Sequence, residues 1–512
     1  MHRRATSVLG LLALLFVALF PLLSCSAKPD PNTLVMIIES SPTNLDPRVG
    51  QDAQSERIDN LIFDDLLARG DNLDVAPGLA ERWEIPDPLT YIFHLHRDVK
   101  FHDGHPLRAR DVKWTFDSLL QGRIRSTKTA AYRFVDRIDA ADDFTVVFHM
   151  KEADGALLWN MSDGAMGIVP WGSAEEISRS PMGSGPFKFV SAETDKEVIL
   201  ERNDDYWGEK PKVSRVRFAV VPDATTEALE LRKGSGDIAI NSLTPDTVFA
   251  LARDPKLEVE RAAGTRLAYL GFNVRDPILK DVRVRQAIAY ALDRRPMIEY
   301  LWRGQAQPAS SVLPPQSWAY NGGVPAYDHD IEKANQLLDS SGYPARDGVR
   351  FHITMKTSTD ENTRLMVAVM QQQLREAGIA LDIRSFEFAT FFSDVQHGAF
   401  QMYGLRWIGG NEDPDIFYAF HSSRFPPNGA NRAFYSNSKL DALIDKARRE
   451  IDPKVRKPLY AEVQRILADD MPYINLWYLD NVLVHTRRVR NLKLNPAGNY
   501  DFLRTAELDS RN

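Results

Sequence analysis

The sequence almost lacks cysteine, since Cys25 is the single one among 512 residues. No intramolecular disulfide can therefore support the fold, which excludes the small disulfide-rich scaffolds of many secreted proteins. Internal repeats and low-complexity segments are also missing. With 44% hydrophobic, 26% charged and 10% aromatic residues, the composition is globular and excludes a disordered, collagen-like or multi-span membrane chain.

Catalytic motifs are absent as well. The sequence contains no HExxH, Walker loop, GxSxG elbow or CxxC. The GSGP run at residues 183–186 suits a tight turn rather than a nucleophile elbow, because proline follows the second glycine and no general base can be assigned to Ser184. The sequence therefore predicts a protein that is not an enzyme and that carries no cofactor.

An excess of basic residues is missing too. Without residues 1–25 the chain loses Arg3 and Arg4 and no acid, which leaves 61 basic and 70 acidic residues and a net charge of −9. Binding to nucleic acid requires clustered lysine and arginine to neutralise phosphates. The charge balance therefore disfavours nucleic acid as a partner.

The N-terminus has the order of an export signal. A basic start at residues 2–4 precedes an uncharged apolar run at 8–23, which is short for a membrane span, and Leu22-Leu23-Ser24-Cys25 follows. These four residues resemble a bacterial lipobox, in which the cysteine becomes the lipid-modified first residue. We expect a lipoprotein signal peptide at 1–25 with lipidation of Cys25, followed by a tether at 26–33. An ordinary signal peptide with an incidental cysteine and an uncleaved anchor remain alternatives.

The mature chain mixes strands and helices over a length that suits about three folding units. Alternating or short apolar runs predict strands at 34–39, 90–96, 144–150, 198–201 and 213–221. Helical spacing of apolar residues predicts helices at 61–68, 109–120, 281–295 with Asp281 as cap, 331–340, 362–377, 439–450 and 458–470. The class is mixed α/β with more than one sheet.

Two groups of residues have the chemistry of a binding site. His94 and His96 share one strand face at a usable metal-ligand spacing, but no cysteine or carboxylate set completes a site, so we assign no metal. Residues 407–415 (WIGGNEDPD) combine an aromatic face, two glycines that let backbone approach a ligand, and acids that pair with cations. The alternative is a glycine-rich surface loop.

Several motifs together resemble the family 5 solute-binding proteins of bacterial ABC importers, which bind peptides, nickel or opines. The run YIFHLHRDVKFHDGHPLRARDVKWTF at 91–116 resembles the family signature, in which HDG is an ordinary turn. The other resembling motifs, in the family's order, are LDP at 45–47, GSGPF at 183–187, RNDDYWG at 202–208, GFN at 271–273, DVRVRQAIAYALDR at 281–294, the A-x-x-LL-x-x-x-GY pattern at 334–343, and YSN-x-x-LD at 435–441.

The resemblance implies an α/β fold like that of the periplasmic binding proteins of type II, cluster C: a two-lobed Venus-flytrap fold with an extra inserted domain. Lobe I would be discontinuous and comprise residues 32–50, 180–270 and 480–512. The small inserted domain would comprise 51–179, and lobe II 271–479. The chain would cross between the lobes near 269–274 and 481–485, which would act as the hinge when the lobes close over a ligand.

The resemblance also implies the function and the partners. A peptide or peptide-like ligand would bind between the lobes and pass to an ABC permease with its ATPase subunits. The protein would be a monomer, exported to the periplasm or the outer face of the membrane and held there through the lipid on Cys25. Ligand contacts are expected from Trp407, Gly409, Gly410, Asn411 and Asp413, with Ser40 and Ser41 across the cleft.

The family's dipeptide binders hold the ligand's ammonium with an Asp and its carboxylate with an Arg. The matching positions here are Gly410 and Thr357, and neither is charged; Glu412, Asp413 or Lys356 remain possible substitutes. We therefore expect a peptide longer than a dipeptide. Two alternatives stay open: the same fold carrying a nickel chelate, haem or oligosaccharide, with His421 near the loop, and a secreted hydrolase.

Overall fold

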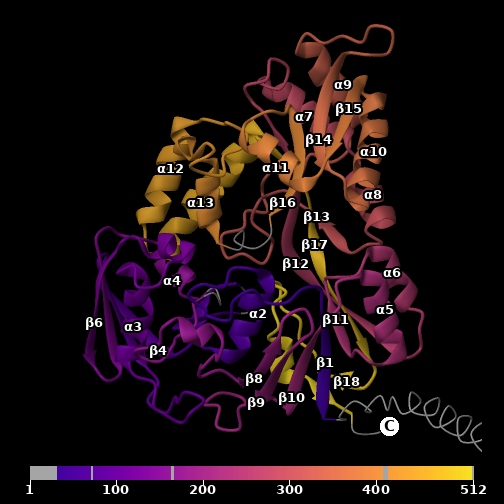
Figure 1. Cartoon of the computed structure of the whole chain (residues 1–512). Helices are drawn as coiled ribbons and strands as arrows, with labels where there is room; N and C mark the ends of the chain where they lie inside the picture. The colour runs from indigo at the N-terminus through magenta and orange to yellow at the C-terminus, as the bar shows by residue number, and fades with distance from the viewer. Residues whose placement is uncertain (1–31, 71–72, 163–165, 408–412, 510–512) are drawn as a thin grey trace, which may run out of the picture.

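The computed structural model describes residues 32–70, 73–162, 166–407 and 413–509. The expected signal peptide, Cys25 and most of the tether lie outside these residues. Within the described ranges, no helix is both long enough and apolar enough to cross a membrane. The chain has the expected mixed α/β class, with one large sheet and one smaller sheet (Figure 1).

The large sheet runs through both lobes. Strand β1 pairs in parallel with β10 and β11, and β14 pairs in parallel with β15 and β16, whereas the remaining neighbours are antiparallel. In spatial order the strands are β15 (Ile379–Phe386), β14 (Phe351–Ser358), β16 (Met402–Trp407), β12 (Leu257–Phe272), β17 (Tyr473–Thr486), β11 (Ile238–Ile240), β1 (Thr33–Ile38), β10 (Arg215–Val220), β9 (Glu197–Arg202) and β8 (Phe187–Glu193), and β13 (Ala306–Pro308) also pairs with β17.

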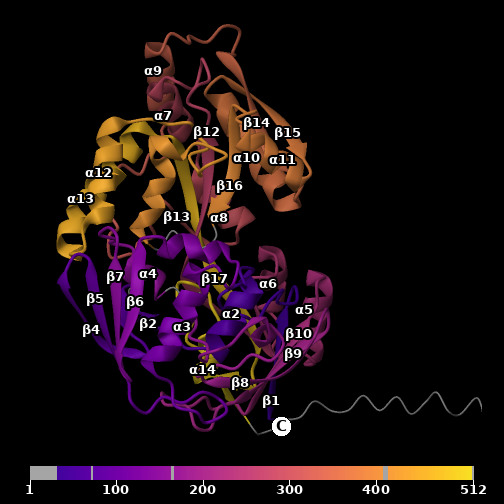
Figure 2. The same ribbon diagram turned by 60° about the vertical axis from the view of Figure 1, so that its left-hand side comes forward.

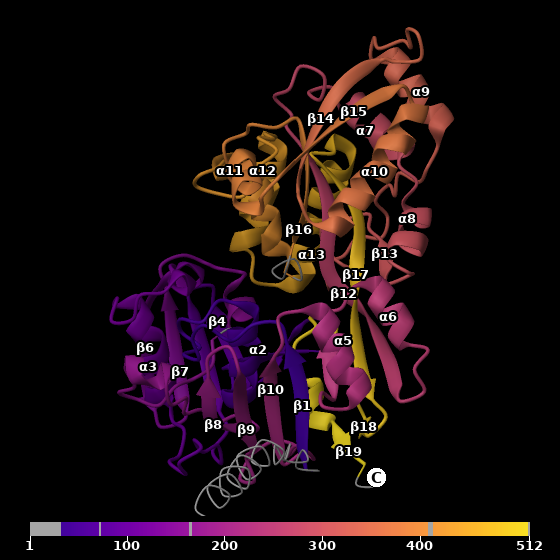
Figure 3. The ribbon, with the colours of Figure 1, turned by 45° about the vertical axis from the view of Figure 1, so that its right-hand side comes forward.

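Two long strands connect the lobes. Figure 3 shows β12 and β17 passing side by side from the lower part of the molecule to the upper part. Their pairing covers 257–262 with 481–486 and 266–271 with 473–479, and the register breaks between Ala262 and Arg266. We propose this break as the hinge; it lies next to the expected crossing at 481–485, and a few residues before the one expected at 269–274.

The second sheet belongs to the small domain, which lies below α12 and α13 in Figure 2. In spatial order its strands are β4 (Ala80–Asp87), β5 (Thr90–Leu95), β7 (Thr145–Met150) and β6 (Val135–Asp142). Strands β5 and β7 alternate buried and half-buried residues, as expected for a sheet with one face on a core. Two separate strand pairs are β2 (Leu67–Arg69) with β3 (Val75–Pro77), and β18 (Val489–Arg490) with β19 (Glu507–Leu508).

Many helices begin at an aspartate, whose carboxylate accepts a hydrogen bond from a backbone N–H of the first turn. The expected cap Asp281 is confirmed, because it accepts from the N–H of Arg283. The α-helices are α2 (Ala53–Ile62), α3 (Ala109–Leu120), α4 (Leu157–Asn160), α5 (Ala224–Lys233), α6 (Pro245–Leu251), α7 (Val282–Ala291), α8 (Arg294–Leu301), α9 (Ile331–Ser340), α10 (Glu361–Glu376), α11 (Phe388–Gln396), α12 (Ser438–Arg449), α13 (Pro453–Asp470) and α14 (Phe502–Thr505). The 3₁₀ helices are η2 (Thr127–Tyr132), η3 (Glu175–Ser178), η4 (Pro414–Phe420) and η5 (Ser422–Arg424).

The helix predicted at 61–68 is wrong. Helix α2 starts earlier, because Asp52 caps it through the N–H of Ser55, and it ends at Ile62. The chain then leaves the helix because the Asp64 carboxylate is buried and accepts hydrogen bonds from Ser184 Oγ at 2.9 Å and Trp207 Nε1 at 2.9 Å. Strand β2 follows directly.

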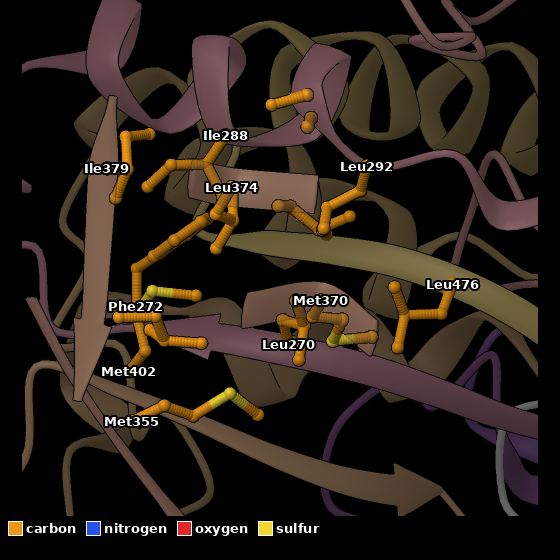
Figure 4. Packing of buried hydrophobic residues seen from close by; sticks show 14 of the residues in the cluster. Leu270, Phe272, Ile288, Leu292, Met355, Met370, Leu374, Ile379, Met402 and Leu476 are labelled. Atoms are coloured by element: carbon orange, nitrogen blue, oxygen red, sulfur yellow. The ribbon is translucent and has the colours of Figure 1, made fainter. Parts of the chain in front are cut away.

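Separate hydrophobic cores fill the two lobes and the small domain. The core of lobe II packs α7, α8 and α10 on the upper ends of β12, β14, β15 and β16 (Figure 4). The lobe I core takes in Ile58, Leu61 and Ile62 of α2 together with Val169 and Ile177. Since these residues pack with lobe I, we propose small-domain boundaries near 63 and 168 in place of 51 and 179.

Candidate functional site

Trp407 is the last residue of β16 and pairs with Leu267 of β12. Its indole ring is stacked on Tyr269, with 6.1 Å between the ring centroids and 22° between the planes. The guanidinium of Arg432 lies 5.8 Å from the same ring. The indole Nε1 is buried and has no hydrogen-bond partner among the described residues. Trp407 therefore offers a fixed aromatic wall with a free donor.

Buried tyrosines hold this wall in place. Tyr269 stacks on Tyr473 with the ring centroids 4.4 Å apart, and the hydroxyl of Tyr403 donates to that of Tyr473 at 3.2 Å. Burial raises the pKa of Tyr269 and of Tyr403 well above the ordinary value. The tyrosines thus stay neutral, and they form a rigid support for Trp407.

Asp413 is the N-cap of η4. Its Oδ1 accepts the N–H of Asp415 at 2.6 Å, whereas Oδ2 is buried without a hydrogen-bond partner in the described part of the chain. Burial raises the pKa of Asp413 to about 7, opposed by Arg456 and Arg69 and reinforced by Asp415. The free oxygen is suited to a cationic or N–H group.

Replacing Asp413 with asparagine is expected to stabilise the ligand-free protein above neutral pH by about 4 kcal/mol, since the pKa is raised by about 3 units and each unit corresponds to about 1.4 kcal/mol. Between the ordinary value of 3.8 and about 7, the unfolded state releases this proton and the folded state retains it. Stability of the native chain is therefore lost as pH rises through this window. Urea unfolding of both proteins from pH 4 to pH 8 measures the difference.

The matched control is Asp98→Asn, at an exposed turn of the small domain. The gap between Asp413→Asn and the native protein should widen between pH 4 and pH 7 and then stay level. A gap that is constant across the whole range would show that Asp413 ionises normally in the folded protein.

Of the other expected contacts, Gly409, Gly410 and Asn411 lie outside the described residues. Ser40 is exposed just after β1. The Ser41 hydroxyl accepts the N–H of Asp195 at 2.7 Å and so ties the chain to the turn between β8 and β9. The structure gives Ser41 a local structural contact, and a ligand contact by either serine stays a prediction.

Thr357, which matches the family's carboxylate-binding arginine, and its possible substitute Lys356 have different surroundings. Thr357 lies on β14, is fully buried, and its Oγ1 has no hydrogen-bond partner within the described ranges. Lys356 is already occupied, because its Nζ lies 2.6 Å from Asp394 Oδ2. Lys356 is therefore a poor substitute for the missing arginine, since binding a carboxylate would compete with Asp394.

Sequence reasoning missed a contact between the small domain and lobe II. The N–H of Gly155 donates to the carbonyl of Arg448 at 2.8 Å, and Arg456 Nη1 donates to the carbonyl of Gly155 at 2.7 Å. Nearby, Trp159 and Trp318 stack with their ring centroids 6.5 Å apart. No sequence signal joins these residues, because the bonded partners Gly155 and Arg456 are 301 positions apart.

The histidines take up local partners. His94 lies 3.1 Å from Glu84, and His96 packs on the ring of Trp207. His102 Nε2 lies 3.1 Å from the carbonyl oxygen of Gly185, and burial lowers the pKa of His102 to about 4. Among the described residues, no three histidine, cysteine or acidic side chains are grouped so that they could hold a metal ion, and this includes the surroundings of His421.

Comparison with known proteins gives one family. Residues 74–428 match the model described as bacterial extracellular solute-binding proteins, family 5 middle. The chain is 30% identical to Di/tripeptide-binding protein 4 of Pseudomonas aeruginosa over 96% of this chain and 98% of the relative. It is 28% identical to Oligopeptide-binding protein AppA of Bacillus subtilis over 97% of each, and 27% identical to Heme-binding protein A of Haemophilus influenzae over 94% and 93%.

Solved structures share the fold. The ABC transporter substrate-binding protein CtaP of Listeria monocytogenes is 28% identical, with a TM-score of 0.84 over 93% of this chain and 99% of that chain. AppA of Bacillus subtilis in complex with a nonapeptide is 26% identical, with a TM-score of 0.73 over 93% and 99%. The expected binding-protein fold is thereby confirmed.

Proposed function

The chain belongs to the family 5 bacterial extracellular solute-binding proteins, and we propose that it captures a peptide or peptide-like solute longer than a dipeptide for import. Relatives named for peptide binding align over nearly the whole chain. They are binding proteins and not enzymes. The one serine in an elbow-like sequence, Ser184, is buried and its hydroxyl donates to Asp64.

The environment of Thr357 carries the proposal on length. A free dipeptide has its two charged ends only a few ångströms apart, so a binding protein needs a charged group near each end. Thr357 is uncharged and fully buried, and the adjacent Lys356 is paired with Asp394. Leaving a ligand carboxylate buried without a partner costs several kcal/mol. A longer solute carries its carboxylate elsewhere in the site.

Trp407 and Asp413 are proposed to contact the ligand. Trp407 Nε1 and Asp413 Oδ2, which have no hydrogen-bond partner among the described residues, supply one donor and one acceptor on either side of residues 408–412. A peptide backbone offers both complements, a carbonyl and an N–H. Gly409, Gly410 and Asn411, which lie between them in the sequence, remain part of the proposed site.

We further propose delivery of the solute to an ABC permease and its ATPase subunits. The protein would act as a monomer at the periplasmic side or the outer face of the membrane, with the lipid on Cys25 as its anchor. The lipobox-like sequence LLSC at 22–25 supports the anchor. Family membership supports the extracellular place of action and the role in import.

Native mass spectrometry of gently purified mature protein tests the ligand. We expect a ladder of bound masses that resolve into peptides of three or more residues, because lobe closure retains ligand during purification. The same spectrum reports lipidation at Cys25 when the protein is expressed with its own signal. A single nonpeptide mass, such as haem or a metal chelate, would reject the peptide proposal and leave the family assignment intact.

A further inference from the structure

Three arginines from different elements surround the place where the lobes join. Arg266 is the first residue of β12 that pairs with β17 again after the register break at 263–265. Arg406 lies on β16, the neighbour of β12 on its other side. Since Ala268 pairs with Arg406, Arg266 is its diagonal neighbour on the same face of the sheet, a separation of about 7 Å between backbones. Arg57 of α2 completes the arginine cluster, because its charge acts on Arg266.

The arginines of the cluster lack acidic partners. None has a carboxylate oxygen within 4 Å among the residues that the structure describes. Arg266 Nη2 donates to Asn241 Oδ1 at 3.0 Å and to the carbonyl of Asp480 at 3.1 Å, while its Nε is buried without a partner. The guanidinium of Arg57 lies over Tyr500 at 5.5 Å, and that of Arg406 over Trp302 at 5.8 Å.

Some other arginines of this chain are paired with an acid. Arg48 donates to both oxygens of Asp46, at 2.9 and 2.8 Å. Arg488 binds both oxygens of Asp237, each at 2.6 Å. Buried Arg285 and Arg294 have no such acid among the described residues, but each donates to four backbone carbonyls, whereas Arg266 has only two acceptors there.

The local field is positive. Burial first, and then the charges of Arg57 and Arg406, together lower the pKa of Arg266 to about 10, against the weaker opposite effect of Asp480 and Glu39. Glu39 is exposed and accepts the amide of Gln54 at 2.9 Å. Asp480 accepts the amide of Gln307 at 3.3 Å. At Arg266 the effect of two arginines exceeds that of two acids, which leaves an excess of positive charge that an anion would neutralise.

We propose that Arg57, Arg266 and Arg406 bind a carboxylate of the solute, so that the protein selects anionic peptides. This inference rests on the proposed function and names the class of its ligand. Trp407 follows Arg406 directly on β16, and consecutive strand residues point to opposite faces. Arg406 and Trp407 therefore lie on opposite faces of the sheet where β16 ends, and a solute that contacts both has to pass around this strand end, which requires an extended molecule. The carboxylate comes from the peptide C-terminus or from an acidic side chain.

Three peptide pools distinguish these sources. Each contains random peptides of three to eight residues: one with neutral side chains and a free C-terminus, one with the same side chains and an amidated C-terminus, and one amidated pool containing glutamate. Refolded, ligand-free protein is mixed with each pool, and the retained peptides are quantified by mass spectrometry. We expect at least tenfold greater retention of one or both acidic pools than of the neutral amidated pool.

The variant Arg406→Gln removes an exposed member of the arginine cluster, so the fold is expected to persist. It should reduce the preference for acidic pools at least fivefold, and Arg57→Gln should act in the same direction. The matched control is Arg137→Gln, an exposed arginine of the small-domain sheet, which should leave the preference unchanged. Equal retention of acidic and neutral pools by the native protein would overturn the carboxylate site alone. Retention of no pool would overturn the peptide function itself.

Discussion

Replacing Gly264 with alanine is expected to destabilise the protein by about 3 kcal/mol, because the new methyl group has no space. A Cβ at this position would lie 2.2 Å from the carbonyl oxygen of Leu479 and 3.2 Å from the N–H nitrogen of Asn481. Both neighbours are backbone atoms of β17, so relief requires the two strands that join the lobes to separate. The thermal unfolding midpoint of the ligand-free protein measures the effect.

The matched control is Gly322→Ala, where the nearest atom to a new Cβ is Tyr320 Cε1 at 3.4 Å, an ordinary contact. That variant should change stability by less than about 0.5 kcal/mol. If both variants unfold at the native midpoint, the close approach of β12 and β17 at Gly264 is not maintained in solution. The proposed position of the hinge would then lose its support.

Replacing Trp407 with alanine is expected to weaken peptide binding about 30-fold to 100-fold, the loss typical of a central aromatic contact. The change removes the aromatic wall stacked on Tyr269 and the unpaired Nε1 donor together. Isothermal titration calorimetry with the peptide identified by mass spectrometry measures the affinity. Trp407→Phe retains an aromatic ring and loses only the donor, so we expect a loss of about fivefold to tenfold, in the range of one hydrogen bond.

Trp171→Ala provides the control for this comparison. Trp171 is 61% exposed, and its ring contacts Trp114 and Arg110. Its replacement should leave affinity unchanged. Native affinity in Trp407→Ala would show that the ring serves only the buried tyrosine packing and would remove Trp407 from the proposed site.

Much of the local structure follows from short-range patterns. The strand expected at 90–96 is β5, and the helix expected at 331–340 has those same bounds. Both depend on periodicity and on capping, which involve residues a few positions apart. The helix expected at 61–68 was wrong because its residues obey a distant constraint: Asp64 is held by Ser184, Tyr206 and Trp207.

The candidate site was predictable only in part. The WIGGNEDPD run drew attention to Trp407 and Asp413 through its composition, and the structure shows an unpaired buried polar atom on each. Nothing in the sequence distinguishes Arg57, Arg266 and Arg406 from the other arginines. Their role depends on the absence of acidic partners, which is a property of the folded surroundings.

By itself the sequence determined the fold class, the family, most helices and strands, and the lack of charge at Thr357, because motifs, periodicity and residue identity are local properties. Only the tertiary structure decided which residues share a site. The register of β12 with β16 brings Arg266 to Arg406, and the packing of α2 adds Arg57. Such contacts depend on the packing of segments far apart in the chain, and burial then sets the charge that each group carries.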